Sequence, residues 1–304
     1  MQPLATIRED AFGASPWAIG ATTTTVTMSL LDSRHEAEVL AFLEERPVHT
    51  FGMVGFIKTN GIVSPHNRGS FLACRDEVGH VLGVALIGHH ILLEIRTHAA
   101  IEAFAKLARE FGGAHLVLAE QELVEAFWSY YADGGQSPRR FCRELLLEQR
   151  WPVEPREAVP GLRRATLDEL ELVVPVQAQC AFDESGIDPM QTDPEGFRQR
   201  CAQRIDLGKT WVLIEDGRLI FKAEVITETS LVSYLEGVWV DPQQRGKGHG
   251  SRCLSQLGTT LLRQSSSVCL LVNEKASSAR AFYQKAGYRF ISYYDTVFLN
   301  RRVH

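Results

Sequence analysis

The residues best suited to chemistry form a glycine-rich loop, Arg245-Gly-Lys-Gly-His-Gly-Ser251, between a predicted strand and a predicted helix. Gly246, Gly248 and Gly250 allow backbone angles that are closed to other residues, and they leave no side chain between the backbone amides and a ligand. The start of the helix directs unpaired N–H groups and the positive end of its dipole at the loop. The arginine and the lysine of the loop add positive charge. The loop therefore predicts a binding site for a pyrophosphate group.

A dinucleotide site is the main alternative for a loop of this kind. The G-x-G-x-x-G order of that site is absent, and so is a parallel βαβ unit before the loop. A second motif lies about thirty residues downstream, where Leu270-Leu-Val-Asn273 is followed by Ala279-x-x-x-Tyr283-x-x-x-Gly287-Tyr288. This motif predicts a strand, a helix and a further strand, which a dinucleotide site does not require.

Together the two motifs resemble the GNAT superfamily of acyl-CoA-dependent N-acyltransferases. The family's phosphate loop reads Arg/Gln-x-x-Gly-x-Gly/Ala after a strand that ends Val-x-Val, and here Arg245-x-x-Gly248-x-Gly250 follows Val238-Trp239-Val240. The resemblance extends from about Gly161 to Phe298. It implies an α/β (α+β) fold with a mixed, mostly antiparallel sheet that is flanked by helices. The sheet is expected to splay between its fourth and fifth strands, with acetyl-CoA in the splay.

The resemblance also implies which residues hold acetyl-CoA. The amides that match Val238 and Val240 would hold the pantetheine arm, and the loop from Arg245 to Ser251 would hold the pyrophosphate. The family often has an asparagine seven residues before the helix tyrosine. That position is Ala276 here, so Asn273 is expected to supply the amide instead. The expected contacts are Val238, Trp239, Val240, Arg245, Gly246, Lys247, Gly248, His249, Gly250, Ser251, Asn273, Ala279 and Tyr283.

Acetyl transfer to an amine needs a neutral nucleophile, a polarised thioester carbonyl and a proton for the departing thiolate. Tyr283 matches the family's tyrosine that faces the CoA sulfur and is the expected general acid, with core packing as the alternative role. Glu236 is the expected base, because it lies two residues before Val238 and so shares its face of the strand. Glu224 is a second candidate. A structural ion pair between Lys222 and either glutamate is an equally compatible reading.

The resemblance places the acceptor site at the loop from Phe182 to Met190, which would lie over the sheet opposite CoA. Glu184 and Asp188 of this loop suit a cationic amine, and Lys222 and Glu224 are further candidates for substrate binding. A solvated acidic loop is the alternative interpretation.

The predicted function is N-acetyltransfer from acetyl-CoA to a primary amine, on a small molecule or a peptide, by direct attack in a ternary complex. The alternative is a CoA-binding sensor or scaffold protein without turnover. No metal is expected, because His89 and His90 are neighbours on a predicted strand and point to opposite faces.

Helix-like and strand-like segments alternate along the whole chain and position these residues. Before the linker we expect helices at 35–45, 98–110 and 121–131 and strands at 70–75, 80–88, 114–119 and 141–148, with an irregular glycine-rich stretch from Gly52 to Gly69. After it we expect helices at 167–181, 194–207, 248–264 and 277–286 and strands at 161–166, 209–215, 218–227, 230–240, 267–272 and 288–298. Asp216-Gly217 predicts a hairpin turn.

Three prolines between Trp151 and Pro160 predict a linker, and the two halves share a similar element order. We therefore expect an arm at 1–27, a first domain at 28–152 and a second, catalytic domain at 153–304. The amino-acid sequence of segments such as Gly83–His90 and Leu219–Val225 resembles that of bacterial GNAT proteins that carry an extra N-terminal domain of unknown function. The first half lacks the Arg-x-x-Gly-x-Gly loop, so a tandem arrangement with one degenerate, GNAT-like half is expected.

The composition narrows the possible partners and location. A formal net charge of -5 offers no basic excess for nucleic acid. No apolar run approaches the length of a membrane span, and the beginning of the chain lacks the order of a signal peptide. Six widely spaced cysteines are expected to be reduced thiols of a cytoplasmic protein. The sequence leaves open whether the chain forms a homodimer.

Overall fold

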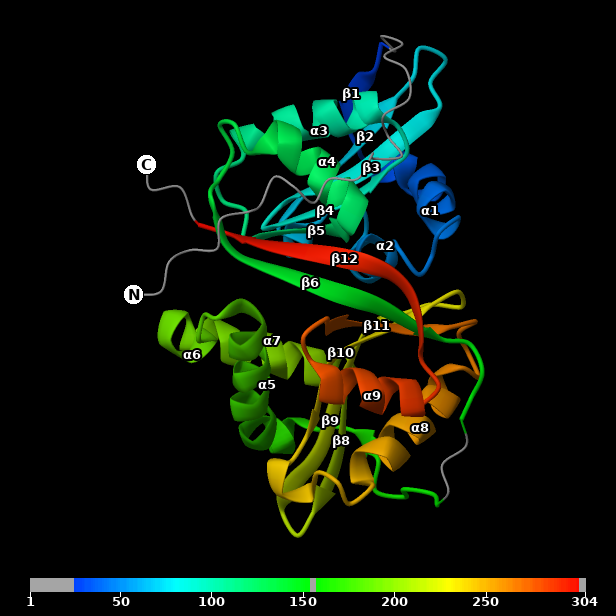
Figure 1. Cartoon of the computed structure of the whole chain (residues 1–304), viewed down its shortest axis with the longest axis vertical. Coiled ribbons are helices and arrows are strands. Elements are labelled where there is room, and N and C mark those ends of the chain that lie inside the picture. Colours follow the sequence, from blue (N-terminus) through cyan, green and yellow to red (C-terminus); the bar gives the residue numbers. More distant parts are fainter. Residues whose placement is uncertain (1–24, 154–156, 301–304) are drawn as a thin grey trace.

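The computed structural model describes residues 25–153 and 157–300, which form one twelve-stranded sheet with helices on both faces (Figure 1). The strands are β1 (Thr27–Leu30), β2 (Gly69–Arg75), β3 (Val81–Gly88), β4 (His90–Ile95), β5 (Leu116–Glu120), β6 (Pro138–Gln149), β7 (Arg163–Arg164), β8 (Thr210–Glu215), β9 (Arg218–Glu228), β10 (Ser233–Val240), β11 (Val268–Asn273) and β12 (Arg289–Leu299). The α-helices are α1 (Glu36–Glu44), α2 (Phe51–Asn60), α3 (His98–Glu110), α4 (Gln121–Tyr131), α5 (Leu170–Ser185), α6 (Pro189–Thr192), α7 (Pro194–Asp206), α8 (His249–Leu261) and α9 (Ser277–Lys285).

The two halves of the chain exchange their last strands. The strand order is β1-β2-β3-β4-β5-β12-β6-β11-β10-β9-β8-β7, so β12 of the second half pairs with β5 of the first, and β6 of the first half pairs with β11 of the second. The two exchanged strands also pair with each other, antiparallel, from Arg289 with Glu148 to Leu299 with Pro138. Figure 1 shows them side by side across the middle of the molecule. Pairing of β6 with β12 therefore fuses two similar halves into one sheet.

Each half has its own apolar layers. In the first half, α3 and α4 pack on one face around Phe104 and Phe127, and α1 and α2 pack on the other around Leu43 and Ile57. In the second half, α8 and α9 pack on one face and α5 and α7 on the other. A smaller cluster joins the halves, and within it the rings of Phe51 and Tyr234 stack with centroids 3.8 Å apart.

Most elements follow the sequence-based predictions. The hairpin turn is confirmed, because Asp216 and Gly217 both have positive φ, at 49° and 72°. Four elements were missed, namely the strands β1 and β4 and the helices α2 and α6, of which α2 occupies part of the stretch predicted to be irregular. Residues 1–24 of the predicted arm lie outside the described residues, and Thr27, the last residue of that arm, begins β1. The predicted boundary at 152/153 falls in the connection between β6 and β7 and stays a prediction.

The prediction for α2 was wrong because glycine in this helix allows close packing and does not mark an irregular segment. A Cβ atom on Gly55 would lie 2.1 Å from Oγ1 of Thr227 in β9, so the glycine lets this first-half helix approach a second-half strand closely. The Thr227 hydroxyl donates a hydrogen bond to the carbonyl oxygen of Phe51 at the start of the same helix, at 3.0 Å. The contact between α2 and β9 thus adds a second junction between the halves.

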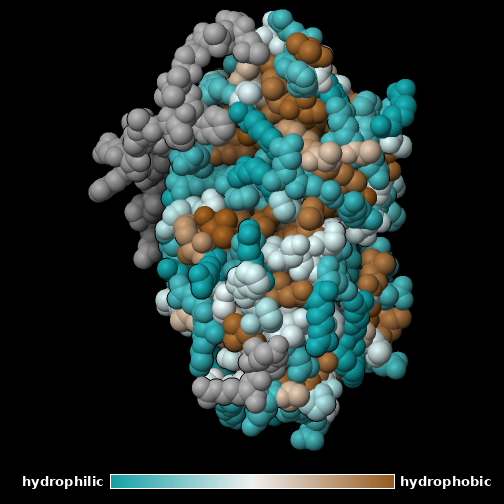
Figure 2. Space-filling view, turned by 90° about the vertical axis from the view of Figure 1, so that its right-hand side faces the viewer, coloured by the Kyte–Doolittle hydropathy of each residue, from teal (hydrophilic) through white to brown (hydrophobic). Residues whose placement is uncertain are grey.

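No helix among the residues that the structure describes is long and apolar enough to cross a membrane. On the face shown in Figure 2, hydrophilic and apolar residues are interspersed, without a continuous apolar band.

A substitution at Gly55 tests the junction. Gly55→Ala should lower the free energy of unfolding by roughly 1–3 kcal/mol through overpacking, although alanine favours a helix by about 1 kcal/mol. Gly113→Ala is the matched control, since its Cβ would meet only ordinary contacts from 3.4 Å outward. Urea unfolding measures both. Equal stability of the Gly55→Ala variant and the wild-type chain would show that α2 does not depend on this close approach.

Candidate active site

The sheet opens between β10 and β11. These parallel strands pair only over Ser233–Leu235 and Val268–Leu270, and from Glu236 onward they diverge. A β-bulge at this point shifts the pairing of β10 with β9, and Gly237 adopts a φ of 56°. The bulge turns the strand away from its neighbour, because an extra residue bends the bulged strand. The predicted splay between the fourth and fifth strands of the second half is confirmed.

The glycine-rich loop lies beside this splay, at the start of α8. Gly246 and Gly248 have φ values of 77° and 88°, and a Cβ on either would meet nothing within 4 Å. Gly248 is the N-cap residue, and no side chain caps the helix or places an acid in its first turn. A Cβ on Gly250, in contrast, would lie 2.7 Å from Cγ2 of Val240, so this glycine permits helix-strand packing. The uncapped helix end and the open space before it fit a pyrophosphate.

A cavity of about 2530 Å³ extends from the loop and the splay to the wall formed by the first half of the chain. Most of the predicted acetyl-CoA contacts line it, namely Val238, Trp239, Val240, Arg245, Gly246, Gly248, Gly250, Ser251, Asn273, Ala279 and Tyr283. Lys247 and His249 do not line it. Nε of Arg245 donates to the carbonyl oxygen of Val240 at 3.1 Å, and Nζ of Lys247 donates to Oε1 of Gln244 at 3.1 Å. Both cationic side chains are thus engaged by their own loop.

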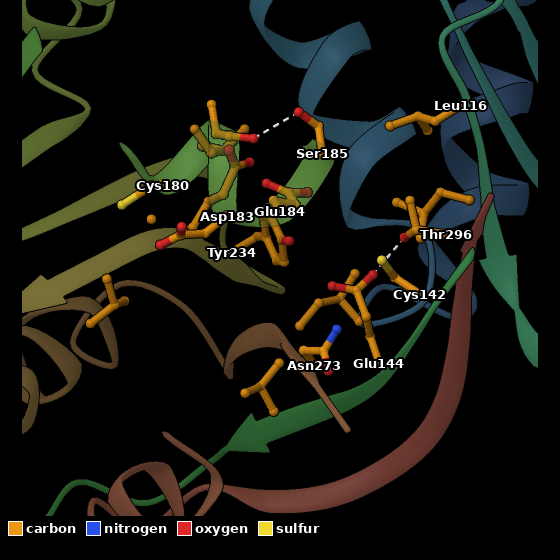
Figure 3. Close-up of a pocket in the computed structure, with 18 of the residues that line it drawn as sticks. Leu116, Cys142, Glu144, Cys180, Asp183, Glu184, Ser185, Tyr234, Asn273 and Thr296 are labelled. Carbon is orange, nitrogen blue, oxygen red and sulfur yellow. Dashed lines mark hydrogen bonds between the residues drawn. The ribbon is translucent and has the colours of Figure 1, made fainter. Parts of the chain in front are cut away.

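Three glutamates line the cavity close to the splay: Glu144 of β6, Glu184 at the end of α5, and Glu236 of β10. Figure 3 shows Glu144 and Glu184 entering the pocket from different sides. Burial, together with the charges of the other two, raises the pKa of Glu184 to about 8. Burial raises the pKa of Glu144 to about 7 against a 2.5 Å hydrogen bond from Thr296. Burial also raises the pKa of Glu236. The site therefore holds carboxyl groups that exchange protons near neutral pH.

The prediction that Glu236 shares a strand face with Val238 is wrong. The bulge at Gly237 inserts one residue, so Glu236 pairs with Glu224 and Trp239 pairs with Lys222. Val238 packs on the α8 face, whereas Glu236 lines a smaller cavity beneath α5 and α7 together with Arg204. A two-residue strand repeat predicts a shared face only while the ladder is regular.

Lys222 and Glu224, predicted to bind substrate, are fully buried and line neither cavity. Their side chains lie 3.4 Å apart, Lys222 also donates to Gln177, and Arg204 pairs with Glu224. Burial raises the pKa of Glu224, but the two cations outweigh it and lower the pKa. This geometry matches the structural ion pair that the sequence left open.

Tyr283 lies on α9 with its ring between the core and the cavity, 8% exposed. Its ring meets that of Tyr288 edge-on, with centroids 5.8 Å apart. Among the described residues no hydrogen-bond partner reaches its hydroxyl group, and burial raises its pKa well above the usual value for tyrosine. The phenol is therefore protonated at neutral pH and has a proton to donate.

The predicted acceptor loop is partly helical, because α5 continues to Ser185 and α6 begins at Pro189. Glu184 lines the cavity, as described above. Asp188 does not line it, and its carboxylate instead caps α6 by accepting from the amide of Met190 at 2.9 Å. Aspartate is among the preferred residues at this N-cap position of a helix.

The contribution of β6 to the cavity was not predicted from the sequence. Arg139, Arg140, Cys142 and Glu144 line the cavity although they belong to the first half of the chain. The polar positions within the predicted strand 141–148 were the only local signal, and nothing local indicates that this strand crosses to the other half. Among residues 25–153 and 157–300, no group of three metal-ligating side chains is placed to hold an ion.

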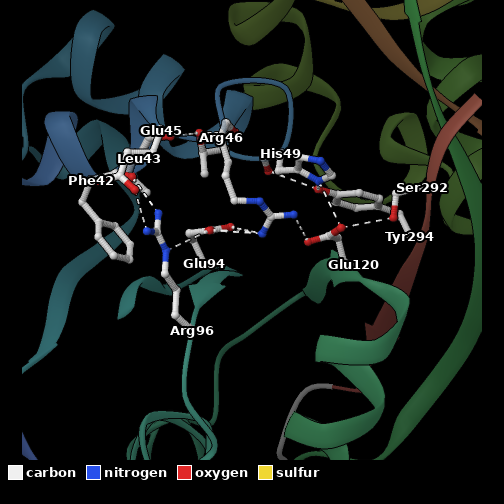
Figure 4. Close-up of polar contacts among 11 residues, drawn as sticks. Phe42, Leu43, Glu45, Arg46, His49, Glu94, Arg96, Glu120, Ser292 and Tyr294 are labelled. Atoms are coloured by element: carbon white, nitrogen blue, oxygen red, sulfur yellow. Dashed lines mark hydrogen bonds and ion pairs between the residues drawn. The ribbon is translucent and has the colours of Figure 1, made fainter. Parts of the chain in front are cut away.

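The first half has a splay of its own, but ion pairs fill it (Figure 4). β4 and β5 pair only over His90–Leu92 and Leu116–Leu118. Beyond that point, Nη1 of Arg46 lies 3.2 Å from both carboxylate oxygens of Glu94, and its Nη2 lies 2.5 Å from Glu120. His49 adds a contact of 3.2 Å to Glu120. The second half leaves the corresponding space open, which supports the expectation that only one half binds a cofactor.

Comparisons with known proteins agree with this geometry. Residues 206–290 match the family model described as "Acetyltransferase (GNAT) domain". No curated protein is similar enough in sequence to match the chain.

Solved structures match over nearly the whole chain. An acetyltransferase from the GNAT family of Colwellia psychrerythraea has a TM-score of 0.56 at 12% identity, covering 90% of this chain and 100% of its own. A GCN5-related N-acetyltransferase from Sphaerobacter thermophilus has a TM-score of 0.58 at 12% identity, with 91% and 96% covered. A tandem GNAT protein from the clavulanic acid biosynthesis pathway has a TM-score of 0.55 at 12% identity, with 92% and 100% covered. These likenesses show the fold, a tandem arrangement of two GNAT-like halves.

The glutamates of the cavity predict how stability changes with pH. In an unfolded chain a glutamate has a pKa near 4.3, whereas Glu144 and Glu184 have values of about 7 and 8 here. The folded state binds more protons between these values, so its stability should fall as the pH rises from about 4.3 through 8. Replacing both residues by glutamine should remove this loss, and thermal unfolding at pH 5 to 9 would show the variant gaining several degrees on the wild-type chain.

Glu122→Gln, at an exposed position of α4, is the matched control and should leave the curve unchanged. If the melting temperatures of the wild-type chain and the Glu144→Gln/Glu184→Gln variant change in parallel with pH, the raised pKa values would be contradicted.

Proposed function

We propose that this chain, which belongs to the GNAT superfamily, transfers an acetyl group from acetyl-CoA to a primary amine by direct attack in a ternary complex. One observation carries the proposal. The uncapped start of α8 and the open splay of β10 and β11 lead into a cavity that also holds Tyr283 and the three glutamates. A cofactor site and an acid-base site therefore share one space.

Acetyl-CoA would supply the thioester whose acyl group is transferred. The loop around Gly246 and Gly248 would hold its pyrophosphate, because the space beside both glycines is open and no side chain there keeps a ligand from the backbone. The backbone of Val238–Val240, which is released from pairing with β11, would hold the pantetheine arm, and Asn273 and Ala279 line the same passage.

The glutamates would bind the cationic amine and accept its proton. A base with a pKa near the working pH combines a useful fraction of the ionised form with enough basicity to take up a proton. We assign this role to Glu236, which lies where the splay begins and within the electrostatic influence of Arg204. Glu144 and Glu184 would add negative charge around the amine.

Tyr283 would hold the proton for the leaving group on its hydroxyl oxygen. Its raised pKa keeps the phenol protonated, and the absence of a hydrogen-bond partner among the described residues leaves the proton available. The alternative, a sensor or scaffold protein, also accounts for the phosphate loop but does not explain why three glutamates line the same cavity.

Two tyrosines allow a matched test of the acid. Tyr283→Phe removes one hydroxyl group and keeps the ring, so kcat should fall roughly hundredfold, or about 3 kcal/mol of barrier, while the affinity for acetyl-CoA changes little. Tyr288→Phe removes a hydroxyl group from a neighbouring ring that does not line the cavity and should leave kcat unchanged. An amine screen based on thiol release provides the acceptor, and calorimetry gives the affinity.

Glu236→Gln should likewise lower kcat and abolish the rise of the rate with pH. A Tyr283→Phe variant with the wild-type kcat would remove this residue from the mechanism, and failure of that variant to bind acetyl-CoA would make it a cofactor-binding residue instead.

A further inference from the structure

A β-bulge at the start of β6 brings two adjacent arginines to the cavity. Arg140 pairs with Phe298, but the next residue of β12, Leu299, pairs with Pro138, so Arg139 is the inserted residue. Alternation alone would point Arg139 and Arg140 to opposite faces, and a bulge re-aims a side chain. Both residues line the cavity, and the guanidinium of Arg139 lies over the ring of Phe298 at 5.5 Å.

The guanidinium of Arg139 is only partly used by the protein. Its Nη1 donates to the carbonyl oxygen of Ser185 at 2.7 Å, while Nε and Nη2 are buried and have no partner among the described residues. Arginine binds a carboxylate in a bidentate manner through this same edge. Arg143, four residues on, shows the geometry, since its Nε and Nη2 bind Asp295 at 2.8 and 3.0 Å.

A structural role explains part of this arrangement. Arg139 and Arg140 donate to carbonyl oxygens at the end of α5, those of Ser185 and Asp183, where a helix leaves acceptors unsatisfied. This role does not use the Nε–Nη2 edge of Arg139. Burying such an edge without a partner costs free energy, which a ligand that fills it would recover.

Arginines of β6 and glutamates of β6, α5 and β10 line the same cavity. Arg140 and Glu144 lie four residues apart on β6, a rise of roughly 13 Å at the spacing of a strand. Next to Arg139, Phe298 meets His115 edge-on at 5.5 Å, and His115 stacks on His89 at 5.2 Å. The anion-binding edge of Arg139 therefore lies roughly the length of a strand segment from Glu144, whereas Arg140, which donates to the carbonyl oxygen of Asp183, lies close enough to Glu184 to act on its pKa.

We infer that the acceptor amine also carries an anionic group, a carboxylate or a phosphate, which binds the Nε–Nη2 edge of Arg139 while the amine lies among Glu144, Glu184 and Glu236. The inference rests on the proposed acetyl transfer and names its substrate class. Arg139 is a specificity-determining residue in this account, because it binds the anionic group of the same substrate whose ammonium group the glutamates attract.

Pairs of amines that differ only in the anionic group test the inference. The probes are 6-aminohexanoate against hexylamine, 4-aminobutyrate against butylamine, and O-phosphoethanolamine against ethanolamine. Calorimetry with the full chain at saturating CoA measures binding, and thiol release from acetyl-CoA measures turnover. At least one probe with the anionic group should bind roughly tenfold to hundredfold more tightly than the partner amine that lacks it, as expected for hydrogen bonds to a charged group. The carboxylate and phosphate pairs show which anion is preferred.

Variants of Arg139 separate ligand binding from support of α5. Arg139→Gln should remove the preference for the anionic probe through a higher KM with little change in kcat, and Arg139→Lys should restore only part of it, because lysine lacks the bidentate edge. Arg109→Gln is the matched control, since Arg109 also donates to a carbonyl oxygen, that of Asp133, but does not line the cavity. The melting temperature and the affinity for CoA should stay at the wild-type values in all three variants.

The outcomes distinguish this inference from the proposed function. Anionic probes that bind with the predicted preference but release no thiol would support the inference and refute the transferase. Amines without the anionic group that bind or react as well as their partners with it, or a preference that survives in Arg139→Gln, would overturn the inference and leave acetyl transfer standing. If no anionic probe binds the wild-type chain at millimolar concentration, the inference is also overturned.

Discussion

The antiparallel pairing of β6 with β12 is the interaction on which the rest of the molecule depends. Each of these strands ends one half of the chain and joins the sheet of the other, so neither half completes its sheet alone. The exchange also delivers side chains across the molecule. Glu144 and the two arginines of β6 reach a cavity whose other wall carries Glu236 and Tyr283 of the second half. Backbone hydrogen bonds between two strands thus determine the charge of a site that neither half could build by itself.

The two halves use the same local geometry in opposite ways. In both, a pair of parallel strands hydrogen-bonds over three residues and then separates. The first half fills the gap with Arg46 between Glu94 and Glu120, and the charges of His49 and Arg46 outweigh burial and lower the pKa of Glu120 to about 2. The second half leaves the gap open beside a helix end without a cap. An ion-pair network that includes the buried Glu94 is costly to break, which supports the proposal that only the second half binds a ligand.

Patterns of neighbouring residues in the sequence correctly predicted those features of the fold that depend on a few consecutive residues. The loop around Gly248, the hairpin at Asp216-Gly217 and the splay all appear where the motifs placed them. The failures have non-local causes. Gly55 signals an irregular segment in sequence but a close helix-strand contact in the fold, and the bulge at Gly237 reverses the faces that strand alternation assigns. The roles of Glu144 and Arg139 depend on the strand exchange, which no pattern of residues in one half can indicate.

The central claim is that only the splay of the second half is open to a cofactor, within a cavity that both halves enclose. A crystal structure of the full chain with bound CoA tests it most directly. We predict one CoA per chain between β10 and β11, with its pyrophosphate at the amides of Gly246–Gly250 and its thiol directed toward Tyr283 and the glutamates. A CoA molecule between β4 and β5, with Arg46 displaced from Glu94 and Glu120, would contradict the account, as would a CoA bound outside the cavity.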